Sequence, residues 1–216
     1  MKKLLIIPIF IVPLLAQNRE DRDLVVKITE KIPYITTINS GKKIKVERIQ
    51  DTNNRLTDDY SKTSRPCPPF CIQPTKIADG VKNIAELELL SFMQNEVPNG
   101  KGVVVDARLK SWFEIETIPS AINIPFPVIQ TASREKAKKI FKLLGMKVKP
   151  NGDWDFSKAK KLAIFCNGMW CEQSRHFIKG MIAHGYPKDK MLYYRDGFQG
   201  WKLLGLTTVV HKEIKK

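Results

Sequence analysis

The sequence is poor in histidine and acidic residues, and it has no apolar run long enough to cross a membrane comfortably. Only 3 of its 216 residues are histidine, and 37 Lys+Arg residues outnumber 22 Asp+Glu residues, which gives a formal net charge of +15. Such a charge favours anionic substrates, acidic partners or anionic lipid surfaces. The lysines are scattered along the chain and no nucleic-acid-binding motif is present, so we expect a generally basic, solvated surface and no nucleic-acid partner.

The longest apolar run lies at the N-terminus and is typical of an export signal. Two lysines precede residues 4–16, which are apolar and include Pro8 and Pro13, and a polar stretch follows them. Because this run is short for a membrane-spanning helix, residues 1–16 are predicted to be a signal peptide, with an uncleaved membrane anchor as the alternative. We therefore expect a bacterial periplasmic protein that contacts the membrane only through this signal peptide.

Cysteine is also scarce, and its four residues form two close pairs. Cys67 and Cys71 lie in CPPFC, and Cys166 and Cys171 lie in CNGMWC. An oxidising compartment permits disulfides, but four cysteines can pair in three ways that sequence alone does not separate. Both spacings suit a zinc site poorly, so no metal or other cofactor is expected. For Cys67 and Cys71 a structural disulfide is preferred, while redox exchange, acceptance of sulfur from Cys166 and copper(I) binding stay open.

Residue patterns divide the rest of the chain into a small β-rich extension and an α/β domain. Residues 17–50 are rich in strand-forming residues around a turn-like NSGK, which predicts two or three antiparallel strands, including a hairpin over residues 34–49. Residues 51–74 are polar, contain CPPFC and are interpreted as a linker. In residues 75–210, short apolar strands alternate with helices, which predicts a parallel sheet with helices on both faces. Asn83 is predicted to cap the first helix, and residues 211–216 form a basic tail.

Two predicted strands end next to residues that could do chemistry. VVVD ends in Asp106, and LAIF ends directly before Cys166. In open α/β sheets the working site lies at the carboxyl ends of the strands. A cysteine at such an end leads into a helix N-terminus, where unpaired backbone N–H groups and the helix dipole favour an anion. Because the cysteine pKa falls from about 8.5 to about 3.5–7.5 in such places, Cys166 is predicted to be a nucleophilic thiolate.

Three stretches together resemble the rhodanese superfamily of sulfurtransferases. VVVDARLKSWFEIETIPSAINIPF resembles that family's strand-Asp-x-Arg segment and its IPGAINIP signature, LAIFCNGMWCEQS its catalytic strand and loop, and GYPKDKMLYYRDGFQGW its closing stretch. The resemblance covers roughly residues 75–208 and implies the rhodanese-like α/β fold. It also implies that Cys166 takes a sulfane sulfur from thiosulfate or a persulfide, holds it as an enzyme persulfide and passes it to a thiophilic acceptor.

Carried over position by position, the resemblance makes Cys166 the nucleophile. It implies that Asp106 and Arg108 support the active-site loop without touching sulfur, and Arg175 is also expected to be a supporting residue. The expected loop consists of Asn167, Gly168, Met169, Trp170, Cys171, Glu172, Gln173 and Ser174. The implied partners are a small anionic sulfur donor or a protein persulfide.

The loop departs from the common family pattern, in which Cys-x-x-Gly-x-Arg is followed by Ser or Thr. Here Ser174 comes late, Arg175 follows it instead of preceding it, and Glu172 stands where the phosphatase relatives of this fold carry an arginine. An enlarged loop could admit a substrate bulkier than thiosulfate. The missing cation argues against a small dianion and against phosphatase or arsenate-reductase chemistry.

Cys171 leaves two interpretations open. It could attack the Cys166 persulfide and form a disulfide that a thiol reductant reopens, or it could be a buried loop residue or a static disulfide partner. Two other functions also stay open. One is a thiol–disulfide or metal-handling protein that uses both cysteine pairs, and the other is a non-catalytic binding module on the same fold.

Overall fold

The computed structural model describes residues 24–212, so the predicted signal peptide and the end of the basic tail lie outside the described residues. The strands are β1 (Tyr34–Asn39), β2 (Lys42–Glu47), β3 (Lys82–Ile84), β4 (Gly102–Asp106), β5 (Glu116–Thr117), β6 (Ala121–Asn123), β7 (Lys147–Val148), β8 (Trp154–Asp155), β9 (Lys161–Phe165), β10 (Met191–Tyr194) and β11 (Val209–Val210). The helices are α2 (Glu86–Asn95), α3 (Lys110–Phe113), α4 (Phe126–Gln130), α5 (Arg134–Leu143), α6 (Gln173–Ala183) and α7 (Gly197–Leu203), with 3-10 turns at Asp59–Ser61 and Lys188–Lys190.

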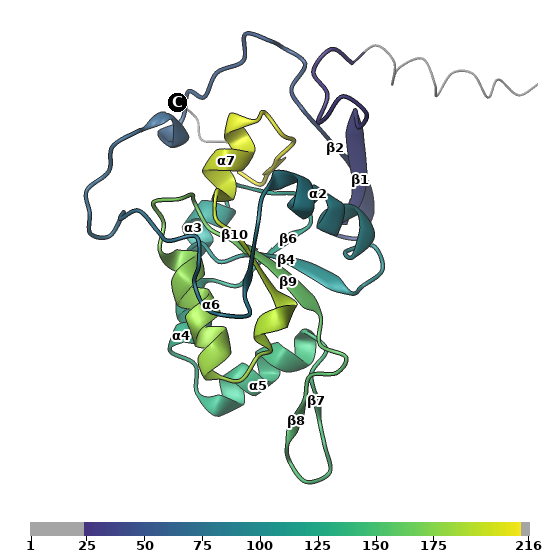
Figure 1. Cartoon of the computed structure of the whole chain (residues 1–216), viewed down its shortest axis with the longest axis vertical. Helices are drawn as coiled ribbons and strands as arrows, with labels where there is room; N and C mark the ends of the chain where they lie inside the picture. The colour runs from purple at the N-terminus through teal and green to yellow at the C-terminus, as the bar shows by residue number, and fades with distance from the viewer. Residues whose placement is uncertain (1–23, 213–216) are drawn as a thin grey trace, which may run out of the picture.

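A five-stranded parallel sheet lies at the centre of the molecule (Figure 1). Its strand order is β3–β10–β9–β4–β6, and every neighbouring pair is parallel. Val104 and Val105 of β4 and the apolar residues of β9 are buried. These inner strands have helices on both sides, which explains why they are unbroken apolar runs in the sequence. The predicted parallel sheet of an α/β domain is thus confirmed.

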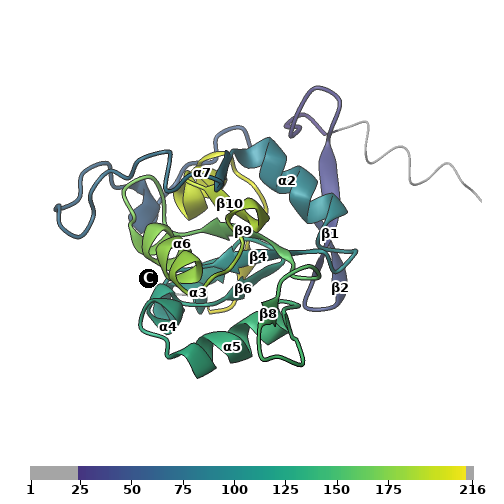
Figure 2. The same cartoon turned by 60° about the horizontal axis from the view of Figure 1, so that its bottom comes forward.

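Helices cover both faces of this sheet, as Figure 2 shows. One face is packed by α2 and α7 and the other by α4, α5 and α6. The buried side chains on the first face include Leu89, Met93, Phe198 and Trp201, and those on the second include Ile129, Phe141, Phe177 and Ile178. The two helical layers exclude water from both faces and fix the strand ends at which the site lies.

The predicted cap of α2 is wrong. The helix begins at Glu86, its N-cap is Ala85, and the Ala85 N–H donates to Glu88 Oε2 at 3.0 Å. Asn83 instead lies in β3, where it is paired with Tyr193 of β10. Pairing with a neighbouring strand therefore extends β3 beyond the point at which the local sequence favours a helix start.

The N-terminal extension forms an antiparallel hairpin of β1 and β2, which is part of the β-rich structure expected there. Ser40 and Gly41 both have positive φ in the turn between the strands, which is the conformation that two-residue hairpins prefer. Ile35 and Val46 share a core with α2, and Thr37 Oγ1 donates to the Met93 carbonyl at 2.7 Å. The hairpin thus extends the first helical layer.

Residues 51–75, called the strap from here on, connect this hairpin to β3 (Figure 1). The sequence marked most of this segment as a linker, and its only regular element is the 3-10 turn at Asp59–Ser61. Its Tyr60 side chain is nevertheless buried in the core.

None of the helices within residues 24–212 is long and apolar enough to cross a bilayer.

Candidate active site

Cys166 directly follows β9 at the carboxyl end of the sheet and precedes α6. The backbone of α7 holds this point in place, because Phe198 N–H donates to the Cys166 carbonyl and Gln199 N–H to the Asn167 carbonyl, both at 2.8 Å. Gly197, with φ +60°, permits this close approach, since a Cβ atom there would lie 2.5 Å from the Cys166 carbonyl oxygen. Gly197 is a site residue that sequence analysis missed, although its place in the family-like closing stretch was a usable signal.

The Cys166 sulfur is surrounded mainly by hydrogen-bond donors. Burial raises the pKa of this thiol, but hydrogen bonds from the Cys171 thiol, from the hydroxyl and N–H of Ser174 and from the Gly168 N–H outweigh burial and lower the pKa below its usual value. The Ser174 hydroxyl is buried and makes no hydrogen bond of standard geometry within the described residues, so no other group competes for its proton. The Cys171 carbonyl oxygen lies 3.1 Å from Cys166 Sγ, and because it accepts hydrogen bonds it favours the protonated form of Cys166. The donors favour the thiolate form of Cys166, and this carbonyl opposes them.

Cys171 lies in the opposite electrostatic situation. Burial raises its pKa well above the usual value, and the hydrogen bond to Cys166 and the negative charge on Cys166 raise it further. Both cysteines are free, so no static disulfide joins them. The pair is therefore best described as a Cys166 thiolate that accepts a hydrogen bond from a Cys171 thiol.

The site is closed to solvent in this structure. Cys166 is only 1% exposed. The strap packs on the active-site loop, since Gln73 N–H donates to the Met169 carbonyl at 2.7 Å and the Arg65 guanidinium lies 3.9 Å from the Trp170 ring centre. A reagent therefore has to displace the strap or the loop before it reaches the sulfur.

The strap also carries the second cysteine pair. Cys67 and Cys71 form a disulfide, with their Cα atoms 4.7 Å apart, which is the arrangement that the sequence analysis preferred for this pair. Within residues 24–212 no group of three or more His, Cys, Asp and Glu side chains could hold a metal ion.

Asp106 and Arg108 form a buried ion pair at the end of the neighbouring strand β4. Arg108 Nη2 lies 2.6 Å from Asp106 Oδ2, and Arg108 Nε contacts both carboxylate oxygens at 2.9 and 3.1 Å. Thr117 Oγ1 donates to the same carboxylate at 2.8 Å. The carboxylate is thus fully committed to local partners, and it supports the strand ends without contacting sulfur.

Tyr60 of the strap joins this ion pair to the active-site loop. Arg108 Nη1 donates to the Tyr60 hydroxyl at 2.8 Å, and that hydroxyl donates to Asn167 Oδ1 at 2.8 Å. Burial raises the pKa of Tyr60 far above its usual range despite the opposing effect of Arg108, so the hydroxyl stays protonated. Sequence analysis missed this residue, because a single tyrosine in a polar segment carries no periodic signal.

The remaining loop residues point in several directions. Trp170 Nε1 donates to Gln199 Oε1 at 2.6 Å, whereas the Met169 side chain is largely exposed. Glu172, which replaces the arginine of the phosphatase relatives, lies 3.5 Å from His176 one helical turn away. The Arg175 side chain makes no hydrogen bond or ion pair within the described part of the chain, so the expected support of the loop by Arg175 is not seen.

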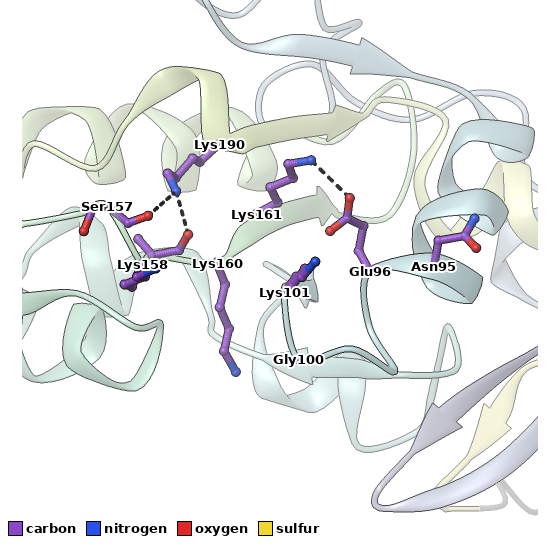
Figure 3. A pocket seen from close by; sticks show the side chains of 10 residues that line it. Asn95, Glu96, Gly100, Lys101, Ser157, Lys158, Lys160, Lys161 and Lys190 are labelled. Carbon is purple, nitrogen blue, oxygen red and sulfur yellow. Dashed lines mark hydrogen bonds and ion pairs between the residues drawn. The ribbon is translucent and has the colours of Figure 1, made fainter.

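A hollow of about 470 Å³ lies at the opposite, amino ends of β4 and β9 (Figure 3). Lysines dominate its lining: Lys101, Lys158, Lys160, Lys161 and Lys190. Figure 3 shows that Lys161 pairs with Glu96. Their charged atoms are 3.1 Å apart, and Lys190 donates to the carbonyls of Ser157 and Ala159. Because the hollow lies at the opposite end of β9 from Cys166, we do not assign it to the active site.

Comparison with known families matches residues 88–204 to the rhodanese-like domain, which is more than half of the 216 residues. The chain belongs to the rhodanese-like domain family. The matched region of this rhodanese-like protein contains Asp106, Arg108 and the whole Cys166 loop, but it contains neither the hairpin nor the strap. No curated protein sequence matches the chain.

Several solved structures are similar to this rhodanese-like protein. The thiosulfate sulfurtransferase of Pseudomonas aeruginosa is 17% identical with a TM-score of 0.40, and the match covers 61% of this chain but only 21% of that chain. A human single-domain sulfurtransferase is 20% identical (TM-score 0.41; 57% of this chain and 96% of that chain). The As-Sb reductase of Leishmania major is 19% identical (TM-score 0.40; 58% and 79%). A shared fold does not determine the reaction, so the reaction has to be argued from the site itself.

Proposed function

We propose that this protein is a sulfurtransferase that carries sulfane sulfur as a persulfide on Cys166. The observation that carries the proposal is the cluster of donors around this one sulfur, which lowers the pKa of Cys166 despite complete burial. A thiolate is the nucleophilic form of cysteine, and its position before α6 adds the favourable helix dipole.

The reaction divides into two displacements. The Cys166 thiolate attacks the outer sulfur of a donor such as thiosulfate, the sulfur–sulfur bond of the donor breaks, and sulfite leaves with the electron pair. An acceptor thiolate then attacks the terminal sulfur of the Cys166 persulfide, and Cys166 leaves as the thiolate. The sulfur is transferred without net oxidation of the protein. The donors that stabilise the thiolate, including the Ser174 hydroxyl, also stabilise the charged persulfide.

The loop chemistry favours a donor larger than thiosulfate. The loop has Glu172 in place of an arginine, and Glu172 is engaged with His176. Two arginines hold the covering strap near the loop: Arg65 of the strap stacks on Trp170, and Arg195 donates to the Gln73 carbonyl at 2.8 and 2.9 Å. Because these side chains hold the strap, they are released when it opens for a small-molecule or protein persulfide.

We place this activity in the periplasm after export. The predicted signal peptide is the main reason, and the Cys67–Cys71 disulfide supports it, because disulfides persist in oxidising compartments and are rare in the cytosol. Secretion of a fusion carrying residues 1–23, compared with one beginning at residue 24, tests this assignment. Equal retention of both fusions in the cytoplasm would contradict it.

Intact-mass measurement after exposure to a sulfur donor tests the activity. The full chain is incubated with thiosulfate or with glutathione persulfide, and we expect the mass to rise by one sulfur atom. Cys166→Ser abolishes this gain, whereas Cys171→Ser keeps it. The proposal fails if neither donor adds sulfur to the unmodified protein, or if Cys166→Ser gains sulfur as readily as the parent.

A second function is favoured by the hydrogen bond between the two free thiols. Cys171 could attack Cys166 Sγ of the persulfide, releasing hydrosulfide and leaving a Cys166–Cys171 disulfide, which a dithiol reductant would reopen. In that case the parent protein ends with two fewer hydrogens and releases sulfide, while Cys171→Ser retains the persulfide. A stable persulfide on the parent protein argues against this second step.

A further inference from the structure

We infer that Tyr60 is a positioning residue for Cys166, because it orients Asn167 and thereby decides which of the two neighbouring sulfurs keeps the proton. The inference deepens the proposed function and rests on it. Tyr60 belongs to the strap, outside residues 88–204 that match the rhodanese-like domain. The four contacts that carry the inference run from Asp106 through Arg108, Tyr60 and Asn167 to Cys171.

The first half of this chain of contacts fixes the Tyr60 hydroxyl. A guanidinium only donates hydrogen bonds. Asp106 pairs with one edge of the Arg108 guanidinium, and Nη1 of Arg108 lies 2.8 Å from the Tyr60 oxygen. The tyrosine oxygen therefore accepts from Arg108, and its own proton is left for Asn167 Oδ1, also at 2.8 Å. The buried ion pair thus sets the direction in which Tyr60 donates.

The second half fixes the Asn167 amide. Because Oδ1 accepts from Tyr60, the amide turns Nδ2 toward Cys171, whose Sγ lies 3.8 Å away. An amide NH₂ only donates, so the Cys171 sulfur acts as the acceptor and its own proton turns to the Cys166 sulfur. A flipped amide would present its oxygen to Cys171, attract that proton and deprive Cys166 of a donor.

The surroundings agree with this direction. The pKa of Cys166 is lowered and that of Cys171 is raised, and the hydrogen bond between the two thiols contributes to both changes. The other titratable or charged groups around the loop are Tyr193, Arg195 and Asp196 at the end of β10, Glu172 and His176 at the start of α6, and Arg65 in the strap. Removal of the Tyr60 hydroxyl changes none of these groups.

Alkylation with iodoacetamide across a pH range, followed by peptide mass analysis, tests the inference on the full chain. The unmodified protein is expected to be alkylated almost entirely at Cys166, with a midpoint below the usual cysteine value of about 8.5. Tyr60→Phe is expected to raise this midpoint by roughly half to one pH unit and to increase the share of alkylation at Cys171. The midpoint depends on the shape of the pH profile, so a looser strap that merely speeds alkylation at every pH does not move it.

Tyr186→Phe is the matched control. It also removes a buried hydroxyl, which donates to the Lys160 carbonyl at 2.6 Å, but it lies in the second core and touches neither sulfur nor loop. We expect no shift of the Cys166 midpoint in this variant. An unchanged midpoint and site distribution in Tyr60→Phe would overturn the inference. Asn167→Leu is the second variant if Tyr60→Phe does not fold, and the same shift is expected.

A double-variant cycle tests the proposed route. Cys171→Ala removes the last donor of the chain and should raise the Cys166 midpoint, and adding Tyr60→Phe in that background should have no further effect. An additional full shift in the double variant would show that Tyr60 does not act through Cys171. No sulfur donor is used, so this test can succeed even if the protein accepts sulfur from none of the donors tried, and the two failures are distinguishable.

Discussion

The two cysteine pairs have similar spacing but different chemistry. Cys67 and Cys71 lie in the strap, outside regular secondary structure, and are joined by a disulfide. Cys166 and Cys171 are buried between a strand and a helix, and both are free. The comparison shows that sequence spacing does not determine the state of a cysteine pair. Its surroundings do, because a helix N-terminus and converging donors place a charge on one sulfur and a proton on the other.

The largest expected effect is on stability, and it comes from breaking the Asp106–Arg108 ion pair near the free cysteines Cys166 and Cys171. Asp106→Asn leaves the Arg108 guanidinium buried without its counter-charge, which should lower the free energy of unfolding by about 3–5 kcal/mol. Urea denaturation measures this loss. The control is Asp59→Asn in the strap, where the carboxylate pairs with Arg65 and Lys62 but is 37% exposed, so the expected loss is below about 1 kcal/mol. Equal losses in the two variants would contradict a structural role specific to Asp106.

A smaller effect is expected from opening the disulfide pair. Replacing Cys67 and Cys71 by serine removes a crosslink that closes a short loop, so the free energy of unfolding should fall by at most about 2 kcal/mol. The pH midpoint for alkylation of Cys166 should stay the same, because neither residue belongs to the chain of contacts through Tyr60. The same denaturation and alkylation measurements check both statements. A shifted midpoint would show that the two pairs are electrostatically linked.

The smallest expected effect is on the pH dependence of sulfur uptake, and it comes from removing the Ser174 hydroxyl, one hydrogen-bond donor to Cys166. Because the pKa of Cys166 is lowered, the rate of sulfur uptake should fall as the pH drops through that pKa, when the thiolate is protonated, and this fall should lie at a lower pH than for an ordinary cysteine. Ser174→Ala removes one donor and should move this profile upward by about half a pH unit. Ser133→Ala, which removes the hydroxyl cap of α5, serves as the control and should leave the profile in place. A Ser174→Ala profile that coincides with the parent would refute the role of the Ser174 hydroxyl.

Short-range patterns predicted most of the sheet and its helices. Neighbouring residues produce the apolar runs of β4, β9 and β10 and the helical periodicity of α5 and α6. These patterns can therefore be recognised from the sequence alone. The misplaced start of α2 is instructive, because pairing of Asn83 with Tyr193 depends on a strand more than a hundred residues away. Gly197 was missed for a similar reason: its close approach to the Cys166 carbonyl joins β9 to α7.

By itself the sequence determined the α/β architecture, the placement of Cys166 behind a buried strand and the family of the domain, because these depend on periodicity and motif order within short windows. Only the tertiary structure decided that the strap closes over the site, that Tyr60 reaches Asn167 across 107 residues of chain, and which cysteines are joined. Contacts of this kind depend on where separate segments meet after folding, so they cannot be predicted from local propensity.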